Sequence, residues 1–414
     1  MSRRLPFVAL LTGVTISTAG TRMSQLAVPW LVLSTTHSAV DTGLVGTAEI
    51  APFVLMQVLG APLVDRFGAH RVSQVGNLMA AVAMGAIPVA WAAGLHQLGL
   101  VLALVFVAGL ARGPADPAEL VLVPSVTELA GTSIDRATAL FDGGSRTAGL
   151  VGVPLAGLLI SALGAANVVV IDAVTFAVAA ALLVVVPVDA GDTGELDEVG
   201  YLNQLIASFA FVRKQPLLRS IAGMVLFTNF ADAAMSGLFV LLWAERHYGG
   251  PGRIGLLSAS FGLGAVLGTA LMVAIGPRLP RRWTYAVTFM IAGAPRFVAL
   301  AISAPFPIIL ATWAVAGLAA GAINPLLGAA QYEAVPRSLQ ARVLAMVGAL
   351  SWAGIPFGAL VGGLLVNSTS LSTAIAIAAA VYFVATLDPI VRPAWKMMDR
   401  QLATAEPRAE RLVA

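Results

Sequence analysis

Ionisable side chains interrupt the long apolar stretches of this chain, and their spacing sorts them into groups. Arg112, Asp116 and Glu119 follow one another at intervals of four and three residues, so on a helix they share one face. Asp142 and Arg146 are also four residues apart. A charged group in the middle of a membrane helix costs roughly 2.5–3.5 kcal/mol, so each needs a partner or a role. Together with Asp65, Arg66 and Arg71, these five residues predict a charge network near the inner membrane surface. The network either closes the inner side of the protein, or its charges only neutralise one another.

A second group of charges falls near the middle of the predicted helices. Arg22 and Asp232 are 210 residues apart and lie at corresponding places in two helices that run in the same direction. Burial disfavours the charged form of an Asp and a nearby Arg restores it, so such a carboxylate can change protonation as its partner moves. The pair is therefore a candidate for proton coupling, and Glu49 is a further one. The alternative is a fixed ion pair that joins two halves of the protein.

The elements that carry these groups are predicted to be membrane-spanning helices. No charged residue occurs between Val72 and Ala111, or between Val343 and Leu387. About 20 apolar residues cross the hydrocarbon core, so each run holds two spans. The runs do not alternate, which favours helices over a barrel. We predict an all-α membrane protein with twelve transmembrane helices, at residues 7–33, 42–62, 72–94, 98–120, 137–163, 166–187, 217–243, 254–275, 284–303, 306–328, 341–366 and 371–391.

Composition and charge placement agree with a membrane protein. Hydrophobic residues make up 58% of the 414 residues and charged residues 11%, against about 25% charged in soluble domains. With the amino terminus inside, the inner segments hold 18 Lys and Arg residues and the outer loops hold 2. The positive-inside rule then predicts that both termini are cytoplasmic. The basic residues are spread over short loops, so we expect no nucleic-acid partner.

Several chemistries lack the residues that they need. The chain has no cysteine, which excludes disulfides and thiolate metal sites, and its four histidines, at 37, 70, 96 and 247, are predicted to fall in loops. No nucleotide-binding loop of the Gly-x-x-x-x-Gly-Lys type is present. No nucleophile–base pair supports an enzyme. We therefore predict a protein that is not an enzyme, with no cofactor and no metal, whose energy comes from an ion gradient or the gradient of its substrate.

The chain also contains an internal repeat. Asp116-Pro117 corresponds to Asn324-Pro325, and the segment Gly152–Gly157 corresponds to Gly354–Gly358. Two parallel six-helix repeats are typical of one transporter architecture. We divide the chain into a first half (1–188), a cytoplasmic linker with an interfacial amphipathic helix (189–216), a second half (217–392) and a disordered cytoplasmic tail (393–414). A partner-docking role for that helix is the alternative.

Several motifs resemble a known family. The segment Gly60-Ala-Pro-Leu-Val-Asp65-Arg66-Phe-Gly68-Ala-His-Arg71 resembles the loop signature of the major facilitator superfamily. Pro29-Trp30-Leu31, the segment Ile171–Phe176, and the segment Phe211–Arg219 are similar to the branch that contains the enterobactin exporter and actinobacterial multidrug-efflux proteins. That branch often carries an Asp where this chain has Thr21-Arg22. The Gly149–Gly157 segment, with Pro154, partly resembles the Gly-Pro signature of drug–proton antiporters.

The resemblance implies the major facilitator fold and a function. In that arrangement helices 1, 4, 7 and 10 line the cavity, Asp65 faces the amino end of helix 11, and a mostly apolar lining suits amphiphilic compounds. We expect a monomeric carrier in the bacterial plasma membrane that exports small amphiphilic compounds in exchange for protons. The alternatives are an importer of a nutrient or siderophore and a non-transporting receptor. The substrate-cavity candidates are Met23, Gln25, Phe227, Asn229, Phe230, Trp313 and Asn324.

Overall fold

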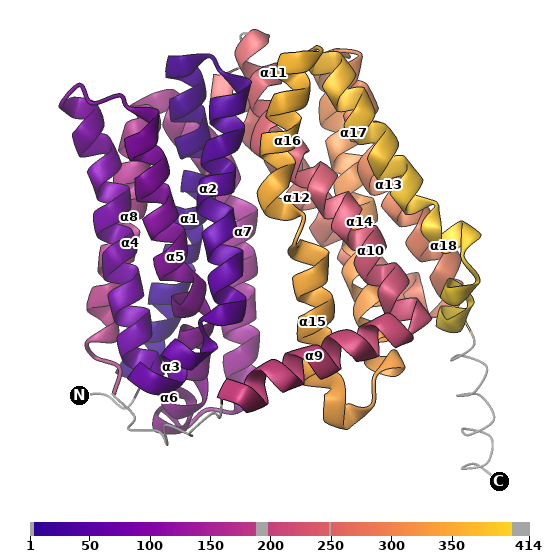
Figure 1. The fold of residues 1–414 in the computed structure, drawn as a ribbon, viewed down its shortest axis with the longest axis horizontal. Helices are drawn as coiled ribbons and strands as arrows, with labels where there is room; N and C mark the ends of the chain where they lie inside the picture. The colour runs from indigo at the N-terminus through magenta and orange to yellow at the C-terminus, as the bar shows by residue number, and fades with distance from the viewer. Residues whose placement is uncertain (1–3, 188–197, 248–249, 400–414) are drawn as a thin grey trace. The chain divides into compact units, whose positions relative to one another are not determined.

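The structure is a computed structural model and describes residues 4–187, 198–247 and 250–399. The described residues form helices and connecting turns (Figure 1). Contacts divide the chain into two compact units. Unit 1 comprises residues 1–198, 236–259 and 359–367, and unit 2 comprises residues 199–235, 260–358 and 368–414. The division therefore does not fall only at the linker, because segments from the second half of the sequence pack within unit 1.

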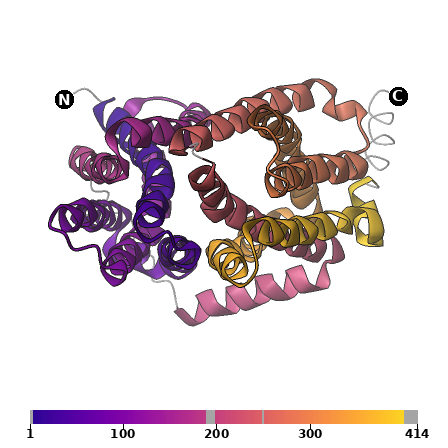
Figure 2. The same cartoon turned by 90° about the horizontal axis from the view of Figure 1, so that it is seen from above.

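Unit 1 is built around six long helices. Its first helix, α1, packs along α7 and α8, while α5 packs between α2 and α4 (Figures 1 and 2). Two short helices, α3 and α6, lie at the lower end of the unit in Figure 1. The bounds are α1 (Leu5–Thr36), α2 (Ala39–Leu59), α3 (Ala61–Phe67), α4 (Ala69–Ala92), α5 (Leu98–Val121), α6 (Val123–Ala130), α7 (Ile134–Leu163) and α8 (Ala165–Leu183).

The lower end of unit 1 holds a compact apolar core. Phe7 and Phe141 meet edge to face with ring centroids 5.8 Å apart, and Leu10 and Val126 are buried beside them. Pro at the first turn of α6 suits a helix start, because it lacks only an N–H that would have no partner there. This core fixes α6 against α1 and α7.

Unit 2 contains six long helices and shares two more, α12 and α16, with unit 1. The bounds are α9 (Glu198–Lys214), α10 (Pro216–Ala234), α12 (Gly250–Ile275), α13 (Arg281–Ala301), α14 (Phe306–Ala334), α15 (Gln340–Trp352), α16 (Ile355–Ser368), α17 (Leu371–Thr386), and the short α18 (Asp388–Val391) and η4 (Pro393–Lys396). A π-helical turn, η1 (Met235–Phe239), joins α10 to α11 (Val240–Arg246). Close glycine contacts hold α12 against α14: a side chain on Gly264 would meet Ala314, and one on Gly321 would meet Ala265.

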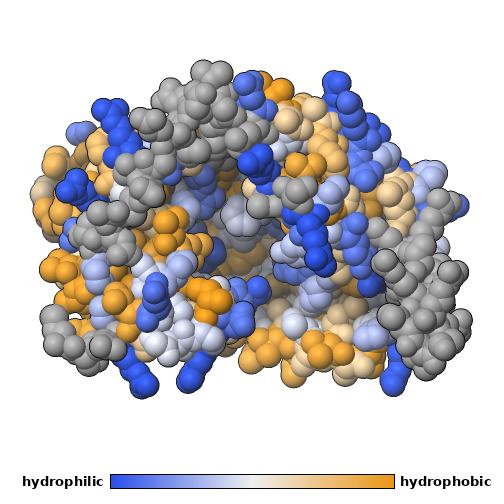
Figure 3. Space-filling view, turned by 90° about the horizontal axis from the view of Figure 1, so that it is seen from below, coloured by the Kyte–Doolittle hydropathy of each residue, from blue (hydrophilic) through white to orange (hydrophobic). Residues whose placement is uncertain are grey.

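Eleven helices within the described residues are long and apolar enough to cross a membrane. The first expected span, residues 7–33, lies within α1, which has 32 residues but is not one of the eleven. Arg22 and Gln25 near the middle of α1 lower its hydropathy. Figure 3 views the helix ends from below and shows hydrophilic residues scattered among hydrophobic ones there.

Three segments differ from the expected boundaries. His70 is not in a loop: α4 begins at Ala69, after Gly68 with φ 83°, and buried His70 forms a 2.8 Å hydrogen bond with the carbonyl of Leu183. The expected span 341–366 corresponds to the candidate span Arg342–Ser368, in which the turn Ala353-Gly354 separates α15 from α16. Residues 393–399, which we assigned to a disordered tail, instead fold against unit 2, with Trp395 fully buried and stacked on Tyr285 at 5.2 Å. Residues 400–414 lie outside the described part of the chain.

Candidate functional site

The Arg112 cluster comprises Arg112, Asp116, Glu119 and Asn77 and lies inside unit 1. Arg112 Nη2 donates to Asp116 Oδ2 at 2.8 Å, one turn along α5. The guanidinium also lies over the ring of Phe53 of α2, at 5.5 Å, and that of Phe176 of α8, at 5.1 Å. An aromatic face attracts a cation, most strongly where water is excluded. Arg112 is therefore held by one carboxylate and two rings from three helices.

Glycines on α5 allow α2 to pack closely against it. A side chain on Gly109 would meet the carbonyl oxygen of Glu49, and one on Gly113 would meet Met56 Cβ. Small residues at such positions let membrane helices pack backbone to backbone. Glu49 is thereby fixed on the part of α2 that faces α5, one turn before Phe53.

Glu119 lies two turns along α5 from Arg112 and is buried. It accepts a hydrogen bond of 2.7 Å from Nδ2 of Asn77, which also donates to the carbonyl of Ser73 at 2.9 Å. A buried polar group is stable only when its hydrogen bonds are made. Asn77 was not predicted as a site residue, although it is one of only three amide side chains in the apolar run 72–111.

The other predicted network residues are not brought into this cluster. Arg146 Nε donates to Asp142 Oδ2 at 2.6 Å, but both side chains are more than 60% exposed. Arg66 lies over the ring of Phe67 at 5.4 Å instead of pairing with a carboxylate. One oxygen of Asp65 is buried without a hydrogen bond in the described part of the chain. Arg71 is exposed on α4. In place of the expected single network, the described residues form a buried cluster on α5 and separate groups on α7, α3 and α4.

Asp172 is almost completely buried where α8 meets α1. Its carboxylate accepts hydrogen bonds from the hydroxyls of Ser24 and Thr175. A side chain on Gly20 would collide with this Asp and Thr pair. The hydrogen bond between Ser24 and Asp172 therefore joins α1 to α8 within an otherwise apolar interface.

The central candidates have partners within their own units. Arg22 is exposed on α1 and its Nη1 donates to Gln25 Oε1 at 3.0 Å. Asp232, at the end of α10 in unit 2, accepts a hydrogen bond of 2.8 Å from Arg296 Nη2 of α13. The expected pairing of Arg22 with Asp232 joins residues of different units and stays a prediction. Arg296 lies 64 residues from Asp232 in the sequence, so spacing gave no indication of this pair.

Aromatic rings surround the Asp232–Arg296 pair. The Arg296 guanidinium lies 5.2 Å from the ring of Phe261 of α12 and 5.9 Å from that of Trp313 of α14. Its Nε donates to the carbonyl of Ala292 at 2.6 Å. The Arg296 side chain is 11% exposed and that of Asp232 38% exposed. The carboxylate is thus the accessible member of the pair. The π-helical turn η1 begins three residues after Asp232, and such turns occur often at functional sites.

The predicted cavity residues differ in exposure. Trp313 and Met23 are buried, whereas Phe227 is 54% exposed and Asn324 is also exposed. Asn229 Nδ2 donates to the carbonyl of Ser351 at 3.0 Å, near the break between α15 and α16. The half-buried residues are Gln25, Asn229 and Phe230.

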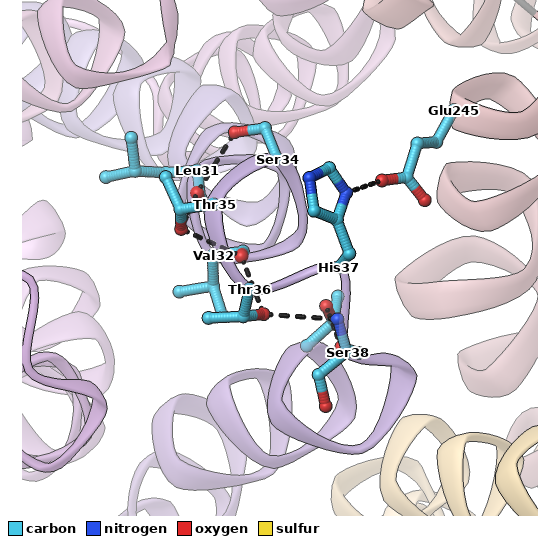
Figure 4. A network of polar contacts seen from close by, with 9 residues as sticks. Leu31, Val32, Ser34, Thr35, Thr36, His37, Ser38 and Glu245 are labelled. Carbon is cyan, nitrogen blue, oxygen red and sulfur yellow. Dashed lines mark hydrogen bonds and ion pairs between the residues drawn. The ribbon is translucent and has the colours of Figure 1, made fainter.

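A contact region at the upper end of unit 1 joins segments that are distant in the sequence. His37 follows α1 with φ 52°, and its Nδ1 forms a 2.6 Å bond with Glu245 Oε1 of α11. Figure 4 shows the His37 ring pointing from the end of α1 toward that carboxylate. In the last turn of α1, the hydroxyls of Thr35 and Thr36 donate to backbone carbonyls of the preceding turn. Sequence analysis assigned His37 only to a loop.

Glycines make the remaining contacts of this region. A side chain on Gly43 or Gly363 would collide with the backbone between α2 and α16, and one on Gly157 or Gly255 would do so between α7 and α12. The predicted Gly-Pro segment therefore lies at a helix contact, since Pro154 and Gly157 touch Gly255.

The described part of the chain is helical, with eleven candidate spans and charge pairs held inside them, which defines a polytopic membrane protein. Its fold is that of the major facilitator superfamily of transporters. The family model for transmembrane secretion effectors of that superfamily matches residues 3–414, and the chain belongs to this family. It is a membrane transporter and not an enzyme.

Curated relatives and solved structures agree with this assignment. The chain is 28% identical over 377 residues to the multidrug efflux pump Tap of Mycolicibacterium fortuitum, covering 89% of this chain and 91% of the relative. It is 27% identical to Tap of Mycobacterium tuberculosis, covering 89% of each. A point mutant of the nucleoside transporter NupG superposes with a TM-score of 0.76 at 14% identity, covering 94% of this chain and 99% of that one. The last similarity concerns the fold alone.

Proposed function

We propose that this protein exports small amphiphilic compounds across the bacterial plasma membrane in exchange for protons. It does so as a monomer with twelve spans in two six-helix repeats, and both termini are cytoplasmic. The bilayer, the exported compound and protons are its partners. The similarity to Tap, which is described as a multidrug efflux pump, supports the direction of transport.

The observation that carries the proposal is the Asp232–Arg296 pair. A carboxylate inside a membrane span is a functional candidate by default, and proton relays in carriers use such groups. Asp232 is accessible, while Arg296 is fixed by Ala292 and aromatic rings. A fixed cation beside an accessible carboxylate stabilises the charged form, and protonation of Asp232 releases Arg296 from the pair. Binding a proton thus changes the interactions of one end of α10 with α13.

The Arg112 cluster is the second place where protonation is coupled to movement. One face of α5 carries Arg112, Asp116 and Glu119, and the backbone carbonyl of Glu49 on α2 lies against Gly109 of the same helix. Arg22 on α1 is a further coupling candidate. Asp65, Arg66, Arg71, Asp142 and Arg146 retain their proposed role at the inner gate.

The organisation of the units supports alternating access. Segments 236–259 and 359–367 pack within unit 1, although the chain on either side of them belongs to unit 2. The glycine contacts and the His37–Glu245 bond hold these segments at the upper end of unit 1. In a rocking carrier this contact region is the outer gate, and its release opens the protein outward.

The test measures the direction in which the protein moves its substrate. A drug-sensitive bacterial host that expresses the protein should accumulate less of a fluorescent amphiphilic cation than the host carrying an Asp232→Asn variant, and a protonophore should abolish the difference. Increased accumulation would identify an importer. Unchanged accumulation with measurable binding to the purified protein would identify a receptor.

A further inference from the structure

Helix α9 has two different faces. Ser208 and Val212 lie one turn apart and are 6% and 2% exposed, so this face packs against the protein. Ile206 and Phe209 lie three residues apart on the helix and are 65% and 49% exposed. Arg213 follows them at helical spacing and is also exposed. The apolar residues of α9 are therefore divided between a buried face and an outward stripe that ends in a cation.

The position of α9 brings this stripe to the membrane boundary. It ends at Lys214, and Gln215 alone separates it from the span that begins at Pro216. Arg219, one turn into that span, donates from Nη1 to the carbonyl of Arg213 at 3.4 Å. Figure 1 shows α9 crossing the direction of the long helices of unit 2, and Figure 2 shows it along the edge of that unit. Because a candidate span begins at Pro216, we expect this corner to lie where hydrocarbon meets headgroups.

Three cations gather at this corner: Arg213, Lys214 and Arg219. Among the described side chains, no carboxylate forms an ion pair with Arg213, Lys214 or Arg219. Exposed apolar side chains that are followed by Lys and Arg favour attachment to a bilayer surface. Each cation near an anionic surface adds favourable electrostatic attraction.

We propose that the outer stripe of α9, formed by Ile206, Phe209, Arg213 and Lys214, is a binding surface for anionic phospholipid. The two apolar side chains enter the acyl boundary, and the two cations bind the headgroup phosphate. The surface anchors the start of unit 2 to the bilayer. This inference rests on the chain being a membrane protein and not on its transport direction.

The absence of cysteine allows a direct test. The Phe209→Cys variant carries one thiol, which is labelled with an environment-sensitive fluorophore, and the full-length protein is reconstituted in phosphatidylcholine vesicles. Spin-labelled phosphatidylglycerol or spin-labelled phosphatidylcholine is then added as quencher. We expect phosphatidylglycerol to quench more strongly. The Arg213→Gln/Lys214→Gln background should lower this preference by about fivefold for each cation removed.

A matched control removes the same charge elsewhere in unit 2. Arg278→Gln/Arg337→Gln changes two exposed cations and should keep the preference. Equal quenching by both lipids, or equal loss in the control, would overturn the selectivity for anionic lipid. Quenching by aqueous iodide but by neither lipid would overturn the membrane contact and indicate a protein partner instead.

Discussion

Arg296 of α13 donates a 2.8 Å hydrogen bond to Asp232 of α10, and these two helices of unit 2 are joined there by opposite charges. The arginine is the more buried partner and lies close to Phe261 and Trp313. The carboxylate is therefore the member that we expect to exchange protons with its surroundings, and the arginine is the fixed counter-charge.

Removal of one member of this pair should destabilise the protein more than removal of both. Arg296→Gln leaves the Asp232 charge without its cation, and we expect a loss of about 1.5–3 kcal/mol in the free energy of unfolding. The double variant Arg296→Gln/Asp232→Asn should recover at least half of that loss. Chemical denaturation in detergent measures it. A double variant as unstable as the sum of the single variants would show that the residues do not interact.

The contact between α2 and α16 should have to open during transport. An ideal Cβ at Gly46 lies 3.7 Å from Ala359 Cβ, within the roughly 3.5–4.5 Å of a disulfide. Oxidised Gly46→Cys/Ala359→Cys should lose transport and regain it after reduction. The control pair Gly85→Cys/Ala173→Cys, at 3.5 Å between α4 and α8, should stay active when oxidised. Transport by the locked Gly46 variant would show that this contact is not a gate.

Gly20 should be needed where α1 meets α8. Gly20→Ala places a methyl group against Thr175 and Asp172, so we expect a loss of about 1–3 kcal/mol in the free energy of unfolding. In Gly223→Ala, on α10, the new methyl group has no atom within 4 Å. This substitution should raise the free energy of unfolding by roughly 0.5–1 kcal/mol. Equal effects of the two substitutions on melting temperature would argue against the close approach.

Trp395 should anchor the segment after α17. It is fully buried, stacks on Tyr285 and donates from Nε1 to Asp388 Oδ2 at 2.7 Å. We expect Trp395→Ala to lose about 3–5 kcal/mol in the free energy of unfolding. Trp283→Ala, at a residue 49% exposed in the same unit, should change it much less. A small effect at Trp395 would place it outside the folded core.

Local spacing predicted what lies within one helix. The intervals between Arg112, Asp116 and Glu119 indicated a shared face, and the Arg112–Asp116 and Asp142–Arg146 pairs are confirmed. Apolar runs predicted most spans because bilayer thickness fixes their length. The start of α4 was wrong by only a few residues, yet this placed His70 in a loop instead of a buried site.

Contacts between distant segments could not be predicted in this way. Arg296 and Asp232 lie 64 residues apart, and His37 and Glu245 lie 208 apart, so spacing carries no information about either pair. The burial of Trp395 was missed because its polar sequence neighbours dominate the composition after Pro393. The assignment of segments 236–259 and 359–367 to unit 1 depends on glycine contacts between helices, which a hydropathy pattern does not contain.

Proton-driven uptake into inside-out membrane vesicles tests the proposed export most directly. With an acidic interior, vesicles that hold the wild-type protein should accumulate a fluorescent amphiphilic cation. Asp232→Asn should bind the compound but accumulate it no faster than vesicles without the protein, because an amide cannot release a proton. Asp135→Asn, at an exposed carboxylate in the first turn of α7, should remain active. Accumulation by Asp232→Asn at the wild-type rate would contradict the coupling role of Asp232.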